Sequence, residues 1–543
     1  MRSSAVWGRG GRGRTAAIVF VFALVSVLQL ALAVTASAAR MPATLRSQAL
    51  ATPSAKFNVI VGGARGASTS AVASAITSAI KSNPGTAKGI KRKYVTVNAA
   101  ASELTGAQIN ALDKNQTIGT IVSDAKVGAK GTLTNPQLWP DVAGVRDFWV
   151  GSQPKPATIA VVDSGVDASR ADLAGRVSAQ VTLTSSAANS TGDGRGHGTF
   201  VASLAAGAGD DYAGVAPTAN IVSLDVLDDS GMGMTSDVIA AADWIYQNKG
   251  KYNIRVANFS LGSSTQSSFM YDPLDKAVEK LWLSGIVVVA AAGNDAVSGA
   301  ASGVPYAPAN DPFVITVGAI DSNGTLTASD DFAAPWSSFG YTLDGFAKPE
   351  LSAPGRYIRG AVPSTSTMYN EHPERVVAPG YMWMSGTSFS APIVAGSAAQ
   401  LLGAHPSWTP DMVKGALMLR AQPGSNPTSL AMGVGEIKAG ASNSGSDAPN
   451  PNAALNSFLI ADPNGGTVPV FDEAAWNRTA QADAAWNRTT FESAAWNSAA
   501  WNRDAWATAA WNRTYFASAT WSAGQTTDGV LPDAAWHRGT WVE

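Results

Sequence analysis

The 543-residue chain contains no cysteine and only four histidines. The absence of cysteine excludes disulfides, zinc–thiolate sites, iron–sulfur clusters and a cysteine nucleophile. So few histidines also argue against a metal site rich in that residue. Charged residues make up only 14% of the chain and hydrophobic residues 45%, a balance that excludes general disorder and can supply a large core. The length predicts two to four domains.

Acidic residues are almost missing from the front of the chain. Residues 1–130 hold 16 lysines and arginines but three acids, whereas residues 131–543 hold 22 bases and 37 acids. A basic front and an acidic remainder argue against a nucleic-acid partner. They favour a front segment that associates with the rest of the chain and can be removed.

Long apolar runs are absent beyond the first forty residues. Within residues 1–39, four arginines precede an uncharged stretch that closes on the small residues Thr35–Ala39. This pattern predicts a cleavable signal peptide, and hence a secreted mature chain that does not span a membrane. The alternative is an uncleaved anchor, because about 20 apolar residues can cross a bilayer.

Composition separates two further parts before the middle of the chain. Residues 40–57 are rich in Ala, Ser and Pro and are expected to be flexible. The segment from Phe57 to about Val127 reads as a small α+β unit. Its expected elements are strands at Phe57–Val61, Tyr94–Val97 and Ile118–Ser123 and a helix at Thr105–Leu112.

Apolar runs alternate with helical periods from about Leu138 to Ser457. Strands separated by helices predict an α/β fold, a doubly wound parallel sheet with helices on both faces. The expected strands include Thr158–Val162, Ile221–Leu227, Arg255–Ser260, Ile286–Ala292 and Phe313–Val317.

The last eighty residues are rich in tryptophan. Nine tryptophans are separated by multiples of five residues: Trp476, Trp486, Trp496, Trp501, Trp506, Trp511, Trp521, Trp536 and Trp541. A five-residue step turns a helix position by about 140° and also changes faces along a strand. We therefore expect a repeat of short strand–turn units. Two interpretations remain open, a self-packing or export-related appendage and a module that binds cell wall or polysaccharide.

Four polar residues in the middle segment occupy positions suited to chemistry. Asp163 ends an apolar strand, His197 lies between glycines ahead of an Ala-rich helix, Asn294 follows a buried strand, and Ser388 begins a second Ala-rich helix. Each alone is commonly a turn former, a structural histidine or a helix cap. Together they can supply a nucleophile, its base and donors to an oxyanion, and the glycines indicate close approach of other groups.

The order Asp, His, Asn, Ser and its surroundings resemble the subtilisin-like serine proteases, or subtilases. The resemblance covers about residues 138–440 and implies a parallel sheet of about seven strands with flanking helices. The matching segments are Asp163–Val166, Gly196–Thr199, Asn258–Gly262, Ala291–Asn294, Lys348–Gly355 and Gly386–Pro392.

The resemblance also implies roles. Ser388 is the expected nucleophile, His197 its general base and Asp163 the group that orients the imidazole, while Asn294 and the Ser388 N–H form the oxyanion hole. Substrate is expected to add as a strand between two segments. One segment is Ser260, Leu261 and Gly262, and the other is Gly231, Met232 and Gly233. The primary pocket is expected to be lined by Ala291, Ala292 and Gly293, with Asp295 at its rim, which predicts an apolar or broad preference.

The basic front unit resembles, more loosely, the inhibitory propeptide of the family, and an ordinary N-terminal domain is the alternative. Self-cleavage is expected between about Val127 and Trp139. The predicted organisation is therefore a signal peptide (1–39), a propeptide (40–137), a catalytic domain (138–460) and a Trp-rich tail (461–543).

The chain departs from the family pattern in several places, two of which bear on the site and on metal binding. Phe200 stands where many relatives have a second histidine, and the run from His197 to Pro217 is too short for the familiar calcium loop. No cofactor is expected to be required. Asp210 and Asp211 could bind a cation, but calcium binding is not predicted.

Two function classes follow. The first is a secreted serine endopeptidase made as a self-processing zymogen, with protein or peptide substrates and its own propeptide as inhibitor. The second is a cell-surface binding protein in which the Trp-rich tail acts and catalysis is dispensable.

Overall fold

The computed structural model describes residues 39–124, 134–150, 153–425, 430–443, 450–482 and 533–535. The chain divides into two compact units, residues 1–129 and 130–543. The predicted signal peptide up to residue 38, the junction 125–133 and most of the Trp-rich tail lie outside the described residues. Among the residues described, no helix is long and apolar enough to cross a membrane.

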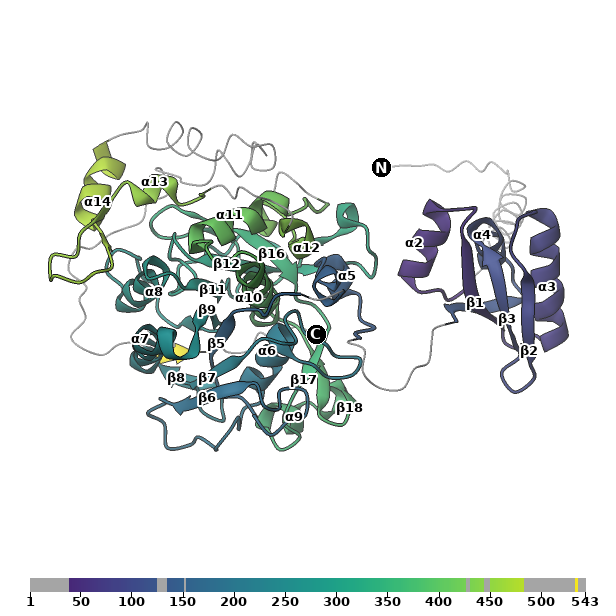
Figure 1. Ribbon diagram of the computed structural model, residues 1–543, viewed down its shortest axis with the longest axis horizontal. Helices are drawn as coiled ribbons and strands as arrows, with labels where there is room; N and C mark the ends of the chain where they lie inside the picture. The colour runs from purple at the N-terminus through teal and green to yellow at the C-terminus, as the bar shows by residue number, and fades with distance from the viewer. Residues whose placement is uncertain are drawn as a thin grey trace, which may run out of the picture. The chain divides into compact units, whose positions relative to one another are not determined.

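The front unit is a four-stranded antiparallel sheet with the strand order β2-β3-β1-β4 (Figure 1). Helices α3 and α4 pack on it, and their apolar residues join those of the strands in one small core. The connection order is that of a split β-α-β unit. The elements are α2 (Ala43–Ala51), β1 (Lys56–Gly63), α3 (Thr69–Ser82), β2 (Gly89–Tyr94), β3 (Ala99–Thr105), α4 (Gly106–Asp113) and β4 (Ile118–Ser123).

Two expectations for this unit were wrong. Residues 40–57 are not wholly flexible, because helix α2 buries Leu45 and Ala49 in the core of the unit. The segment Tyr94–Val97 is largely a turn that follows β2, with Val95 and Val97 exposed. Its apolar residues mark the tip of a hairpin whose second strand, β3, is rich in alanine and gives little strand signal.

The second unit is built on a sheet of eight strands. Its order is β13-β12-β11-β9-β5-β7-β6, with β16 also paired to β12. All pairs are parallel except the short β13, which is antiparallel to β12. The strands are β5 (Thr158–Asp163), β6 (Val177–Thr182), β7 (Ile221–Asp225), β9 (Ile254–Phe259), β11 (Val287–Ala291), β12 (Ile315–Asp321), β13 (Phe332–Ala333) and β16 (Leu351–Pro354).

Helices cover this sheet in two layers, as the alternation of strands and helices predicts. Helices α6 (His197–Ala206) and α10 (Thr387–Ala404) pack against each other, and so do α7 (Thr235–Tyr252) and α8 (Pro273–Leu283). Every residue of β5, β7 and β11 is buried, which accounts for their continuous apolar sequences.

The remaining elements of this unit are short. They are α5 (Trp139–Val142), β8 (Met232–Met234), β10 (Gly262–Ser263), β14 (Gly340–Tyr341), β15 (Ala347–Lys348), β17 (Ile358–Ala361), α9 (Thr367–Glu371), β18 (Val376–Ala378), β19 (Tyr381–Met384), α11 (Pro410–Arg420), α12 (Ala439–Ser442), α13 (Ala453–Asn456), β20 (Leu459–Ile460), β21 (Val470–Phe471), α14 (Glu473–Ala482) and β22 (Asp533–Ala535). Four 3-10 turns complete the list, at Arg146–Trp149, Ala328–Asp330, Pro373–Arg375 and Leu430–Met432.

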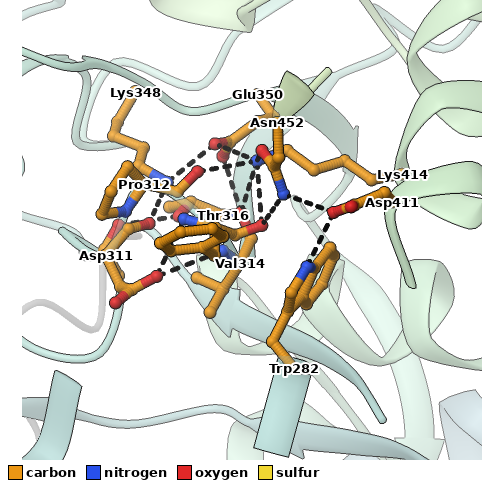
Figure 2. A network of polar contacts seen from close by, with 12 residues as sticks. Trp282, Asp311, Pro312, Val314, Thr316, Lys348, Glu350, Asp411, Lys414 and Asn452 are labelled. Carbon is orange, nitrogen blue, oxygen red and sulfur yellow. Dashed lines mark hydrogen bonds and ion pairs between the residues drawn. The ribbon is translucent and has the colours of Figure 1, made fainter. Parts of the chain in front are cut away.

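A buried ionic network joins the segment between β15 and β16 to α11 (Figure 2). Glu350 Oε1 lies 2.7 Å from Lys348 Nζ and 3.0 Å from Lys414 Nζ, and Lys414 also donates to three backbone carbonyls of residues 312–314. Burial lowers the pKa of Lys414 to about 8. Burial acts to raise the pKa of Glu350, but the two lysines outweigh it and the pKa is lowered. Lys348 and Glu350 of the Lys-Pro-Glu sequence therefore have a structural role. Their ion pairs fix this segment to Lys414 of α11.

The Trp-rich segment begins inside the core of this unit. Trp476 is fully buried and packs on Phe269, Phe346 and Phe471. It lies on helix α14, not on the strand–turn unit that the spacing predicts, and Asp472 caps the helix by accepting from the Ala475 N–H at 2.8 Å. Packed structure thus continues past residue 460.

Candidate active site

Asp163 and His197 meet at the carboxyl edge of the sheet. Asp163 ends β5 and His197 begins α6, and the His197 Nδ1 to Asp163 Oδ1 distance is 2.6 Å. Both side chains are fully buried. The carboxylate therefore fixes the proton on Nδ1 and leaves Nε2 as the basic nitrogen. This geometry is suited to a base whose cation is stabilised when it forms.

Glycines on either side of His197 permit this approach. A Cβ at Gly198 would lie 2.0 Å from the Gly165 carbonyl oxygen. Gly196 has φ 94°, and a Cβ there would lie 2.4 Å from Ser366 Oγ. The expectation that these glycines allow close approach is confirmed.

Ser388 is the second residue of α10, the helix that packs against α6. Its neighbour Phe389 packs on the His197 ring with 5.3 Å between centroids. The Ser388 hydroxyl donates to the Ser260 carbonyl at 3.2 Å. The first N–H groups of a helix have no partner within the helix, so the backbone around Ser388 is suited to stabilising negative charge.

Pro392 explains how the Ser388 carbonyl is held. Because proline has no N–H, it cannot bond to the carbonyl four residues earlier in the helix. Ser260 Oγ donates to that Ser388 carbonyl instead, at 2.8 Å, and Asn258 Nδ2 donates to Ser260 Oγ at 2.9 Å. Sequence reasoning missed this role of the Ser260 hydroxyl, which the proline at i+4 could have indicated.

Asn294 lies close to the serine and is 9% exposed. Its Oδ1 accepts from both the N–H and the hydroxyl of Thr387, each at 3.0 Å. These two bonds fix the amide so that its oxygen faces Thr387 and its Nδ2 group is directed elsewhere. An oriented amide N–H at the mouth of a helix is suited to binding an oxyanion.

One pocket brings together the serine, the asparagine and two of the predicted substrate segments. It is lined by Ser260, Leu261, Gly262, Ala291, Ala292, Gly293, Asn294, Tyr306, Ala309, Thr387 and Ser388. None of these side chains is charged, and Asp295 is not among them. Tyr306 and Ala309 were missed, because they follow the strand β11 by more than a dozen residues. The third segment, Gly231, Met232 and Gly233, leads into and forms most of β8.

Asp193 is a further site residue that the sequence did not reveal. Its Oδ1 accepts from Gly196 N–H at 2.6 Å and Ser164 Oγ at 2.9 Å, while Oδ2 accepts from Thr199 N–H at 2.7 Å. The carboxylate therefore ties the loop after Asp163 to the start of α6. Burial raises the pKa of Asp193 to about 7.

The departures from the family pattern are explained in part. Phe200 is fully buried and packs on Phe389 with 4.6 Å between ring centroids, so it contributes to the core. Asp211 Oδ1 accepts from Thr134 Oγ1 at 2.9 Å. Among the residues that the structure describes, no group of three or more His, Asp or Glu side chains is arranged to hold a metal ion.

Known proteins resemble this chain across the unit that holds the site. Residues 155–446 match the model of the subtilase family. Serine protease AprX of Bacillus subtilis is 34% identical over 340 residues, which cover 60% of this chain and 74% of that protein. Subtilisin of Bacillus pumilus is 38% identical over 262 residues, covering 48% and 81%. The crystal structure of a cold adapted subtilisin-like serine proteinase matches with a TM-score of 0.40 and 32% identity, covering 51% and 86%.

The chain therefore belongs to the subtilase family. The parallel sheet flanked by helices agrees with the expected fold class, apart from its antiparallel edge strand β13. Within the family, the protein is a subtilisin-like serine peptidase.

Proposed function

We propose that the protein is a secreted serine endopeptidase made as a self-processing zymogen. The observation that carries the proposal is the contact between His197 and Asp163 beside Ser388 and a fixed Asn294 amide. The pocket next to Ser388, lined mainly by alanine and glycine, supports an apolar or broad preference for the residue before the cut bond.

Catalysis follows from these groups. Ser388 Oγ attacks the peptide carbonyl carbon while His197 Nε2 accepts its proton. The negative oxygen that forms is bound by Asn294 Nδ2 and the Ser388 N–H. The C–N bond then breaks as His197 returns the proton to the amine, and water activated by the same histidine hydrolyses the acyl-enzyme. These steps use groups of the chain and water, so we expect activity to persist in a chelator.

The front unit is proposed to act as a removable inhibitor. The first unit carries most of the unopposed positive charge of the chain, and complementary charge favours its association with an acidic partner. In the second unit, Asn135 Nδ2 donates to the Ala213 carbonyl and Arg146 donates to the Asn135 carbonyl. These bonds favour a maturation cut in the first part of the range expected for it, which runs from about Val127 to Trp139.

The test compares Ser388→Ala with Ser390→Ala. Ser390 is a second buried serine of α10, and its hydroxyl donates to the Ala353 carbonyl at 3.0 Å. Each secreted protein is treated with a fluorophosphonate and its intact mass is measured. We expect the native chain and Ser390→Ala to lose the front unit and gain one adduct, whereas Ser388→Ala stays longer and unlabelled.

Equal masses and no label in all three proteins would exclude the proposed nucleophile. The second candidate, binding through the tail with a dispensable peptidase, would then be examined with a polysaccharide pull-down. Residues 483–532 and 536–543 of that tail lie outside the described residues.

A further inference from the structure

A strand from the far end of the chain lies between the two segments expected to bind substrate. Strand β22 (Asp533–Ala535, yellow in Figure 1) forms a three-stranded sheet of order β10-β22-β8. Ala535 faces Gly262 and Ala534 faces Ser263 on one side. On the other side Asp533, Ala534 and Ala535 face Met234, Gly233 and Met232. The strand is antiparallel to both neighbours.

This position is that of an added substrate strand. An extended peptide that enters an open sheet satisfies the backbone groups of the strands at its sides. The register also gives a direction: because β22 is antiparallel to β10, its carboxyl end leads from Gly262 toward Ser260. A free peptide in this register has the residue opposite Gly262 two positions before the residue opposite Ser260. The Ser260 carbonyl accepts from the Ser388 hydroxyl. Strand β22 therefore runs toward Ser388 with its carboxyl end leading, as the acyl part of a substrate must.

The connection is long enough to place this strand in the cleft. Fifty residues separate Ala482, the end of α14, from Asp533. Fifty residues reach about 170 Å at most, whereas a folded unit of this size has a radius of gyration of about 20 Å, so the length of the connection does not prevent the strand from reaching the cleft. A competitor in the same chain also acts at an effective concentration that is set by its connection to the unit and not by the concentration of the protein. A weak strand can thus compete with free peptide.

We propose that residues 533–535 are a resident ligand of the substrate cleft, competing in cis with peptide substrates. The ligand is an alanine strand that precedes tryptophan, a unit that recurs six times in the tail as Ala-Ala-Trp. The preferred free substrates are then extended peptides with small residues three and four positions before the cut bond. This inference rests on the proposed function, which identifies the cleft as the substrate site. It adds that residues 533–535 occupy that cleft.

The experiment uses the secreted chain with a matched pair of variants. Ala534→Pro/Ala535→Pro removes two successive N–H donors, which in a central strand point to opposite neighbours. Ala509→Pro/Ala510→Pro makes the same change in another Ala-Ala-Trp copy and is the control. Intact mass is recorded first, to establish that the tail is present in the assayed enzyme. Initial rates on an Ala-rich peptide then give KM and kcat.

We expect KM to fall roughly two- to tenfold in Ala534→Pro/Ala535→Pro, since the competitor is removed, with kcat unchanged and the control equal to the native enzyme. An unchanged KM would overturn the proposal. Loss of residues 533–543 from the native enzyme would also overturn it, because no strand would remain to compete.

Hydrogen exchange of the same three chains separates this proposal from the proposed function. The amides of β8 and β10 should exchange faster only in Ala534→Pro/Ala535→Pro, whether or not the protein is active. Faster exchange in an inactive protein would support the bound strand and contradict the proposed peptidase function. Equal exchange in an active protein would retain the peptidase and reject the strand.

Discussion

At the scale of single residues, the Ser260 hydroxyl holds the Ser388 carbonyl, because Pro392 has no N–H to donate to it. Replacement of Ser260 by Ala leaves the Ser388 carbonyl without the donor that it has at 2.8 Å. An unsatisfied buried acceptor costs about 1–3 kcal/mol, and displacement of a reacting group is costly to rate. We expect Ser260→Ala to lower kcat about tenfold and to destabilise the fold, with little change in KM.

The control for this prediction is Ser397→Ala. Ser397 is buried in the same helix, and its hydroxyl donates to the Ile393 carbonyl at 2.7 Å. Peptide hydrolysis and thermal unfolding are measured for both variants. A kcat loss of the same size in Ser397→Ala would assign the effect to general damage of α10.

Asp193 predicts a pH dependence of stability. The pKa of its carboxyl is raised by burial to about 7, whereas an unfolded aspartate titrates near 3.9. Between these values the folded state binds more protons than the unfolded state, so stability decreases as pH rises. The native chain should therefore lose stability relative to Asp193→Asn from about pH 4 to about pH 7. Denaturant unfolding at several pH values measures this difference, and a constant difference would contradict the prediction.

At the scale of elements, the approach of α6 to the β5 loop depends on one glycine. A Cβ at Gly198 would meet the Gly165 carbonyl oxygen at 2.0 Å, so a shift of backbone is required. Overpacking of this kind costs about 1–3 kcal/mol, and the shift falls on His197. We expect Gly198→Ala to abolish most activity and to lower the unfolding temperature.

Gly250→Ala is the matched control for that variant. Gly250 lies in helix α7 with no atom within 4 Å of the added Cβ. Alanine there favours the helix, so stability should stay equal or increase by up to about 1 kcal/mol. Activity assays and calorimetry compare the two. Equal activity losses would show that the contact with Gly165 is not the cause.

Elements also show how far the sequence leads. Buried strands with β-branched residues, such as Thr158–Val162, are found within a residue or two of their observed ends. The alanine-rich β3 gives no strand signal because alanine favours helices and is depleted in strands. Helix α14 is mispredicted because the strand–turn expectation comes from the spacing of all nine tryptophans. Only Trp476 lies in this helix, and its burial in the core of the unit is not visible in that spacing.

The candidate catalytic residues could be predicted from the sequence better than the residues that hold them in place. Asp163, His197, Asn294 and Ser388 carry motifs, and the structure brings them to one edge of the sheet. Asp193 has no such signal, because an aspartate in a glycine-rich loop is commonly a turn former. Its bond with Ser164 joins segments about thirty residues apart, which no local pattern specifies.

At the scale of the whole molecule, the peptidase unit extends further than its motifs. A chain that ends at residue 482 keeps the buried Trp476, whereas one that ends at residue 460 lacks it. Loss of a buried tryptophan side chain costs about 3–5 kcal/mol. We expect the second chain to be strongly destabilised relative to the first. Equal unfolding temperatures, measured by calorimetry, would show that the core is complete at residue 460.

The position of Trp476 in the sequence also determines when, during synthesis, the core of the second unit can be completed. Its partners Phe269 and Phe346 precede it by more than a hundred residues. A chain that is made from its N-terminus therefore presents Trp476 after both of them. The aromatic cluster that surrounds it therefore stays open until almost the entire polypeptide has emerged. A peptidase that completes its core so late is kept from acting on its own chain while that chain is still being made.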